Sequence, residues 1–157
     1  MKKLLLVVTL FLCAFSLTSC MLRALTYGKY EFLHESEPYE TMTIQIVKIS
    51  EGYNDCATVS TADLRDQMTV IATIEDKDKE AFMKELSRVE HNDPLGDPPF
   101  GLSSGHAIVL IYSDGTKELI ARKGCALIDG ETTDIEYHGW FVKESYTQFV
   151  EKWLPRE

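Results

Sequence analysis

The 157-residue chain lacks an excess of positive charge, and it lacks the short motifs that mark most nucleotide-dependent and metal-dependent enzymes. It carries 16 Lys and Arg against 25 Asp and Glu, a formal net charge of −9. Nucleic-acid binding depends on cationic contacts to phosphate, so this balance argues against a DNA or RNA partner. The sequence contains no Walker A motif, dinucleotide fingerprint, Cys-x-x-Cys or His-Glu-x-x-His. We therefore expect no nucleotide, no other cofactor and no metal.

The chain also lacks an apolar run of the roughly 20 residues that a membrane-spanning helix needs. Its longest apolar run, Leu4 to Leu17, follows the basic start Met1-Lys2-Lys3. A short apolar run behind a basic start is typical of a secretory signal. Two alternatives stay open for this region: an ordinary cleaved signal followed by an unrelated cysteine, and an uncleaved N-terminal helix.

The run ends in Leu17-Thr18-Ser19-Cys20, which resembles the lipobox of bacterial lipoproteins. The resemblance implies that the Cys20 thiol receives a diacylglyceryl group and that residues 1–19 are removed. It also implies a membrane or outer-membrane lipoprotein that faces the periplasm or the exterior. Met21 replaces the aspartate that would favour retention in the inner membrane. The rest of the chain is similar only in general style to uncharacterised small envelope lipoproteins.

Removal of residues 1–19 from the 157-residue chain would leave 138 residues, which is the size of one domain. We expect residues 20–38 to form a tether with a possible edge strand, and residues 39–157 to form a single domain. The signal takes Lys2 and Lys3 and no acid, so the net charge would fall from −9 to −11. An acidic domain is not drawn to anionic lipid, so the acyl chains on Cys20 would hold the membrane alone.

Cysteine is scarce, with four residues in the chain. Cys13 would leave with the signal and Cys20 would carry lipid, which leaves Cys56 and Cys125. In an exported protein this pair predicts a disulfide. The bond would close a loop of about 70 residues and contribute roughly 4 kcal/mol on the chain-entropy model. The alternative is two buried free thiols.

The remaining pattern predicts an α+β fold, with an antiparallel β-sheet and two amphipathic helices packed on one face. The helices are expected at about 76–90 and 142–154, where apolar residues recur at helical spacing. Strands are expected at 41–50, 67–74, 106–112, 117–122, 125–128 and 133–138, with a brief strand at 56–60. Asp114-Gly115 predicts a hairpin with a type I′ turn. Residues 106–112 are apolar on both faces, which predicts a central strand.

The longest irregular stretch, residues 91–105, carries three prolines and three glycines, and such loops often hold functional residues. It ends in Gly101-Leu102-Ser103-Ser104-Gly105, a match to the G-x-S-x-G nucleophile elbow, with Asp134 and His138 following in the order of a catalytic triad. An elbow needs a strand before it and a helix after it. Here prolines precede the motif and a β run follows it, so we do not expect Ser103 to be a nucleophile. We expect no catalytic residues, and we expect a binding surface formed by Asp93, Asp97, Phe100, Ser103, His106 and His138.

Three classes of function are compatible with these features. The first is a non-enzymatic, lipid-anchored envelope protein that binds another macromolecule, such as an inhibitor or immunity-type lipoprotein acting on a basic lytic enzyme or toxin. The second is a small envelope hydrolase, in which residues of the 91–105 loop would meet His106 or His138 in a cleft. The third is an assembly accessory with an apolar patch or an unpaired sheet edge.

Overall fold

A computed structural model describes residues 27–28, 30, 32, 38–52, 59–92, 101–129 and 132–155. In chain order its elements are β1 (Tyr27–Gly28), β2 (Thr43–Ile49), β3 (Val59–Ser60), α2 (Thr61–Asp66), β4 (Met68–Thr73), the 3₁₀ helix η1 (Asp76–Asp78), α3 (Lys79–Leu86), β5 (His91–Asn92), β6 (Gly105–Ile111), β7 (Lys117–Ala121), β8 (Lys123–Asp129), β9 (Thr132–Phe141) and α4 (Lys143–Trp153). Several predicted features lie outside the described residues, namely the signal at 1–19, Cys20, Cys56, Asp93, Asp97 and Phe100.

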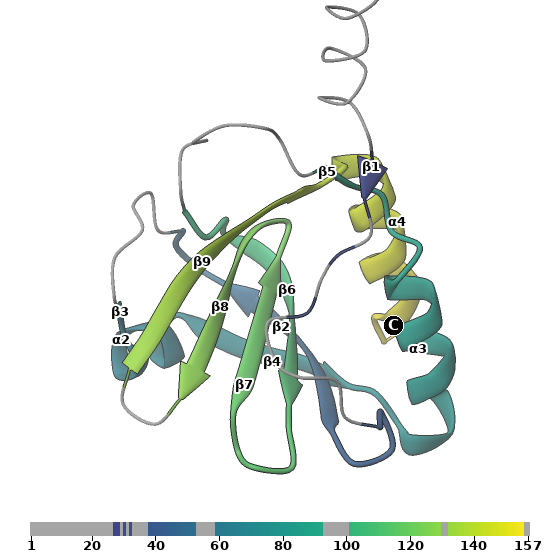
Figure 1. Cartoon of the computed structure of the whole chain (residues 1–157), viewed down its shortest axis with the longest axis horizontal. Coiled ribbons are helices and arrows are strands. Elements are labelled where there is room, and N and C mark those ends of the chain that lie inside the picture. The colour runs from purple at the N-terminus through teal and green to yellow at the C-terminus, as the bar shows by residue number, and fades with distance from the viewer. Residues whose placement is uncertain are drawn as a thin grey trace, which may run out of the picture.

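The described strands join one antiparallel sheet (Figure 1). The strand order is β1-β5-β9-β8-β7-β6-β2-β4, and β3 pairs with one end of β9. This confirms the α+β class with an antiparallel sheet. Among the described residues, no helix is long and apolar enough to cross a membrane.

Strand β6 lies in the interior of the sheet, between β2 and β7, as its sequence predicts. Side chains of a strand alternate between the two faces of a sheet. Ile108 and Leu110 therefore point into one cluster of buried side chains, and Ala107 and Val109 into another. All four are at most 3% exposed. The continuous apolar run exists because both faces of this strand are covered.

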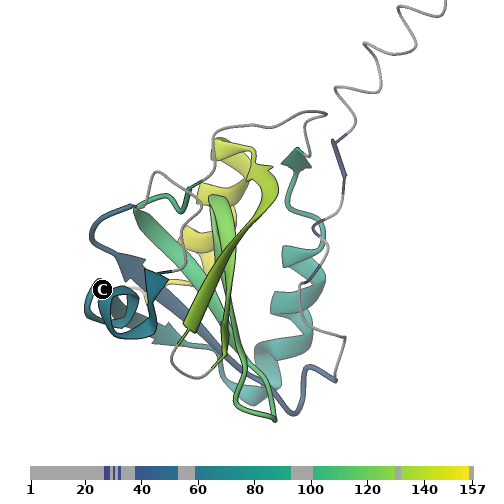
Figure 2. The same cartoon turned by 60° about the vertical axis from the view of Figure 1, so that its left-hand side comes forward.

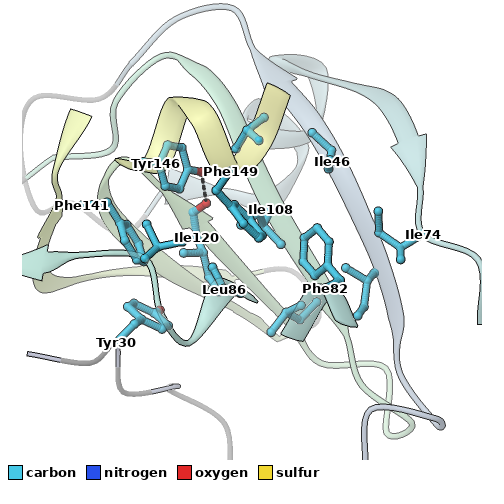
Figure 3. Close-up of a cluster of buried hydrophobic side chains, with 14 of the residues drawn as sticks. Tyr30, Ile46, Ile74, Phe82, Leu86, Ile108, Ile120, Phe141, Tyr146 and Phe149 are labelled. Carbon is cyan, nitrogen blue, oxygen red and sulfur yellow. Dashed lines mark hydrogen bonds between the residues drawn. The ribbon is translucent and has the colours of Figure 1, made fainter. Parts of the chain in front are cut away.

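The first cluster joins the sheet to α3 and α4. It contains Phe82 and Leu86 of α3 and Phe149 of α4, together with side chains of β2 and β6 such as Ile46 and Ile108 (Figure 3). The second cluster lies on the other face and contains Leu64 of α2. Helix α2 was not predicted, because six residues with a single buried leucine are too few for helical periodicity.

The hairpin between β6 and β7 forms as predicted, but its turn type was predicted wrongly. A type I′ turn needs positive φ at two residues. Gly115 has φ 92°, whereas no described non-glycine residue has positive φ. The Gly115 amide donates to the Tyr112 carbonyl at 3.0 Å, and the Tyr112 amide donates to the Thr116 carbonyl at 2.9 Å. This is a three-residue loop in which a glycine in the left-handed region follows the turn.

Both predicted helices form, with different accuracy at their ends. Helix α4 spans Lys143–Trp153, within one residue of the expected range at each end. The predicted helix at 76–90 is instead the short helix η1 followed by α3, which ends at Leu86. Beyond α3 the Glu90 amide donates to the Ser145 hydroxyl at 3.1 Å, so a side chain of α4 satisfies it. Tertiary contact therefore replaces the last helical turn.

Candidate binding pocket

A pocket of about 170 Å³ lies between α4 and the neighbouring ends of β6 and β7. Its apolar wall comes from two buried α4 residues, Tyr146 and Val150. Its polar lining consists of Ser104, His106, Arg122, Lys143, Thr147 and Glu151. Here a residue of the expected binding surface, His106, lines a cavity together with several polar side chains.

Helix periodicity explains how α4 contributes to the pocket. Lys143, Thr147 and Glu151 are spaced four residues apart, so they share one face of the helix. Tyr146 and Val150 lie beside them and are at most 3% exposed. The polar residues therefore border the pocket while the apolar pair closes it on the side of the core.

Tyr146 fixes the position of α4 against the sheet. Its hydroxyl donates to the Ile120 carbonyl at 3.0 Å (Figure 3) and lies 3.3 Å from the His106 carbonyl. Burial raises the pKa of Tyr146, and the nearby Arg122 charge only partly opposes this effect. The hydroxyl therefore stays protonated at any working pH and acts as a neutral donor, not as a base.

Two basic side chains at the pocket have no ion-pair partner among the described residues. Elsewhere Lys79 pairs with Asp76 at 2.8 Å, and Lys152 pairs with Glu85. Neither Arg122 nor Lys143 makes an ion pair with any residue in the described ranges. Arg122 is partly exposed and Lys143 is exposed. Two cations, of which Arg122 is partly shielded from solvent, therefore line a cavity that has Glu151 as its one acidic lining residue.

The structure gives the other expected site residues different surroundings. The Ser103 hydroxyl accepts a hydrogen bond from the Lys123 amide at 3.1 Å, and the Ser103 amide donates to the Lys123 carbonyl at 3.0 Å. Ser103 thus joins its segment to the start of β8, and it is not a lining residue of the pocket. His138 belongs to β9, but its side chain is outside the described part of the structure.

A second polar group lies inside the core. Glu118 is fully buried and accepts hydrogen bonds from the hydroxyls of Tyr30 at 2.7 Å and Tyr112 at 2.6 Å. Burial, reinforced by the neighbouring Cys125 and Glu118, raises the pKa of Tyr30. Cys125 is buried in the same cluster. The Cys56–Cys125 disulfide stays a prediction, because Cys56 is outside the described residues.

A larger groove, of about 520 Å³, runs between α3 and α4. Its lining includes Glu85, Glu90 and Glu144 together with Arg88 and Lys152. The Lys152 ammonium is already paired with Glu85. This groove therefore presents charges of both signs and favours no ligand class.

The sequence pattern identified His106 but not the basic residues beside it. Arg122 is the last residue of a predicted strand and Lys143 is the second residue of a predicted helix, and neither position suggests that the two side chains share a cavity. The only available signal was the four-residue spacing of Lys143, Thr147 and Glu151. Comparison of the chain with protein-family models, with curated proteins and with solved structures found no match.

Proposed function

We propose that this protein is a lipid-anchored, non-catalytic binding domain of a bacterial cell envelope, and that its pocket recognises an anionic group. The observation that carries the proposal is the pair Arg122 and Lys143, which lack ion-pair partners in the described structure. Arg122 is partly buried, and desolvating a cation without a partner has an energetic cost. An anionic ligand would remove that cost.

The lipobox-like sequence supports the anchor. A basic start, an apolar run, two small residues and Cys20 occur in the required order. The acyl chains on Cys20 would be the contact with the membrane, in the inner or the outer membrane. Metabolic labelling with palmitate tests this proposal: we expect label on the wild-type chain and none on Cys20→Ala, and an unlabelled wild type would refute the anchor.

We also infer that α3 and α4 cover the same face of the sheet. Four contacts between the helices support this inference. The Phe82 ring lies 5.0 Å from that of Phe149 and 5.3 Å from that of Trp153, measured between centroids. Lys152 pairs with Glu85, which also accepts a hydrogen bond from the Trp153 indole at 3.2 Å.

Thermal-shift measurements test binding at the pocket. The full chain in maltoside micelles would be titrated with phosphate, sulfate and acetate at constant ionic strength. We expect at least one anion to raise the melting temperature of the wild type but not of Arg122→Gln/Lys143→Gln. The control Lys77→Gln/Lys84→Gln removes the same charge from exposed positions and should respond like the wild type. Equal responses in all three proteins would contradict the proposal.

A specific observation favours an assembly accessory as the second candidate. Strand β4 ends the sheet order, and its Val70 and Ile71 are 53% and 38% exposed. An exposed apolar edge strand can pair with another strand. Analytical ultracentrifugation would test this: Val70→Lys should abolish any self-association, and a wild type that stays monomeric would refute self-pairing.

The inhibitor or immunity-type alternative requires an acidic surface that binds a basic enzyme. The chain's net charge of −9 fits that requirement but does not locate a surface. The hydrolase alternative requires Ser104 and His106 to act together at the pocket. Ester hydrolysis that His106→Ala abolishes would favour the hydrolase over the binding domain.

A further inference from the structure

The pocket lies close to the point where the N-terminal segment joins the sheet. The Phe141 amide donates to the Arg122 carbonyl at 2.8 Å, Phe141 pairs with His91, and His91 pairs with Gly28. Three steps between neighbouring strands, each about 4.8 Å, place Gly28 about 14 Å from Arg122. Figures 1 and 2 show β1, β5, the end of β9 and the start of α4 together at one end of the molecule.

The anchor limits how far this end can be from a membrane. Tyr27, the first residue of β1, is seven residues after Cys20. Seven extended residues span at most about 24 Å. If Cys20 carries acyl chains in a bilayer, the end of the domain that holds β1 and the pocket must stay near the lipid headgroups.

The donors at the pocket suit a phosphate group better than a carboxylate. Arg122 offers a planar guanidinium and Lys143 an ammonium, while Ser104 and Thr147 offer hydroxyls. A phosphate presents more acceptor oxygens than the two of a carboxylate, and arginine binds it in a bidentate manner. At about 170 Å³ the pocket is smaller than the sites that hold drug-sized ligands. It has room for one phosphate group but not for a nucleotide.

We propose that the pocket binds a single phosphate group and that, in the anchored protein, this group belongs to a phospholipid headgroup of the same membrane. The proposal rests on the proposed function, because it uses both the anchor and the anionic pocket. It adds a second membrane contact to the acyl chains. It also means that a domain with net charge −9 presents a locally cationic site to the bilayer.

The test uses the lipidated full chain with two probes. In maltoside micelles, inorganic phosphate is titrated while the amide resonances of residues 104–106, 122 and 143–147 are followed by NMR. In nanodiscs, hydrogen exchange at the same residues is compared between phosphatidylglycerol and a galactolipid that contains no phosphate. Arg122→Gln/Lys143→Gln is the test variant, and Lys77→Gln/Lys84→Gln is the control of equal charge. All four residues are at least partly exposed, so folding should survive.

We expect phosphate to shift the pocket resonances and the test variant to weaken binding by at least about tenfold. We also expect slower exchange at the pocket in phosphatidylglycerol than in galactolipid, with the difference lost only in the test variant. Phosphate binding without the lipid effect would overturn the headgroup as the source and leave the proposed function intact. Failure of both probes would overturn the inference and the pocket's role together. A lipid effect that persists in the test variant would also overturn the inference, because it would not arise at the pocket.

Discussion

Replacement of Tyr30 by phenylalanine tests whether the buried carboxylate holds the N-terminal segment on the domain. The hydroxyl of Tyr30 donates to Glu118 at 2.7 Å in the core. The substitution removes this bond and keeps the ring, which contacts Phe141 at 5.4 Å and His91 at 5.5 Å between centroids. A hydrogen bond to a charged group contributes about 1.5–3 kcal/mol. We expect the free energy of unfolding to fall by that amount and the melting temperature to fall by roughly 5–10 °C.

Urea denaturation followed by far-ultraviolet circular dichroism and by tryptophan fluorescence measures this loss. Tyr39→Phe is the matched control, because Tyr39 is only partly buried and neighbours the exposed Glu40, which raises its pKa through a hydrogen bond. We expect the control to change the free energy of unfolding by less than about 0.5 kcal/mol. The reasoning fails if Tyr30→Phe is as stable as the wild type, or if the two variants lose the same stability.

Two further predictions concern a glycine and an ion pair. Gly124→Ala should lower the free energy of unfolding by more than about 2 kcal/mol, because Gly124 has φ 77° and a Cβ there would collide with the Gly101 carbonyl. Gly115 has φ 92° but open space around it, so Gly115→Ala should lower the free energy of unfolding by only about 1 kcal/mol. Thermal denaturation of both variants measures the difference. Lys152 lowers the pKa of Glu85 in the folded protein. The ion pair therefore stabilises the fold fully above the pKa of Glu85 in the unfolded chain, about 4.3, and this stabilisation is lost as the pH falls through the lower pKa of the folded protein. Glu85→Gln should therefore lower the free energy of unfolding by less than about 1 kcal/mol at pH 7, and this difference from the wild type should shrink below about pH 4.

Local patterns were enough to predict most of the sheet. The strand at Gly105–Ile111 has an unbroken apolar run, and the hairpin after it has an Asp-Gly pair, so both were predicted from a few neighbouring residues. The turn type was not predicted correctly, because it depends on which residue takes positive φ. Helix α2 was missed because its one buried residue, Leu64, becomes meaningful only once it covers a sheet face.

The pocket could not be predicted either, because its residues come together only in the folded chain. Arg122 and Lys143 are 21 positions apart, and only the pairing of β8 with β9 brings them to one cavity. Glu118 is a similar case, since an acidic residue on a hairpin strand would be expected to face solvent. Its burial is tolerated because Tyr30 and Tyr112 donate to it, and Tyr30 lies 88 positions earlier.

In the proposed anchored protein, the docking of Tyr30 would determine how close the pocket stays to Cys20. With β1 paired to β5, the chain from Cys20 to Tyr27 can span at most about 24 Å. Without that docking the connection would run to Pro38 and reach about 60 Å. The effective concentration of headgroups at the pocket would fall, because it decreases roughly as the −3/2 power of tether length.

Tyr30→Ala removes the hydroxyl and the ring contacts together, so it should release the segment. We expect this variant to keep the affinity of the pocket for inorganic phosphate, since Tyr30 does not line it. We expect it to lose much of the slower exchange that phosphatidylglycerol nanodiscs produce at residues 143–147. Unchanged protection in the nanodiscs would mean that the length of the tether does not position the pocket. An equal loss of phosphate affinity would mean that Tyr30 acts through the stability of the domain and not through the tether.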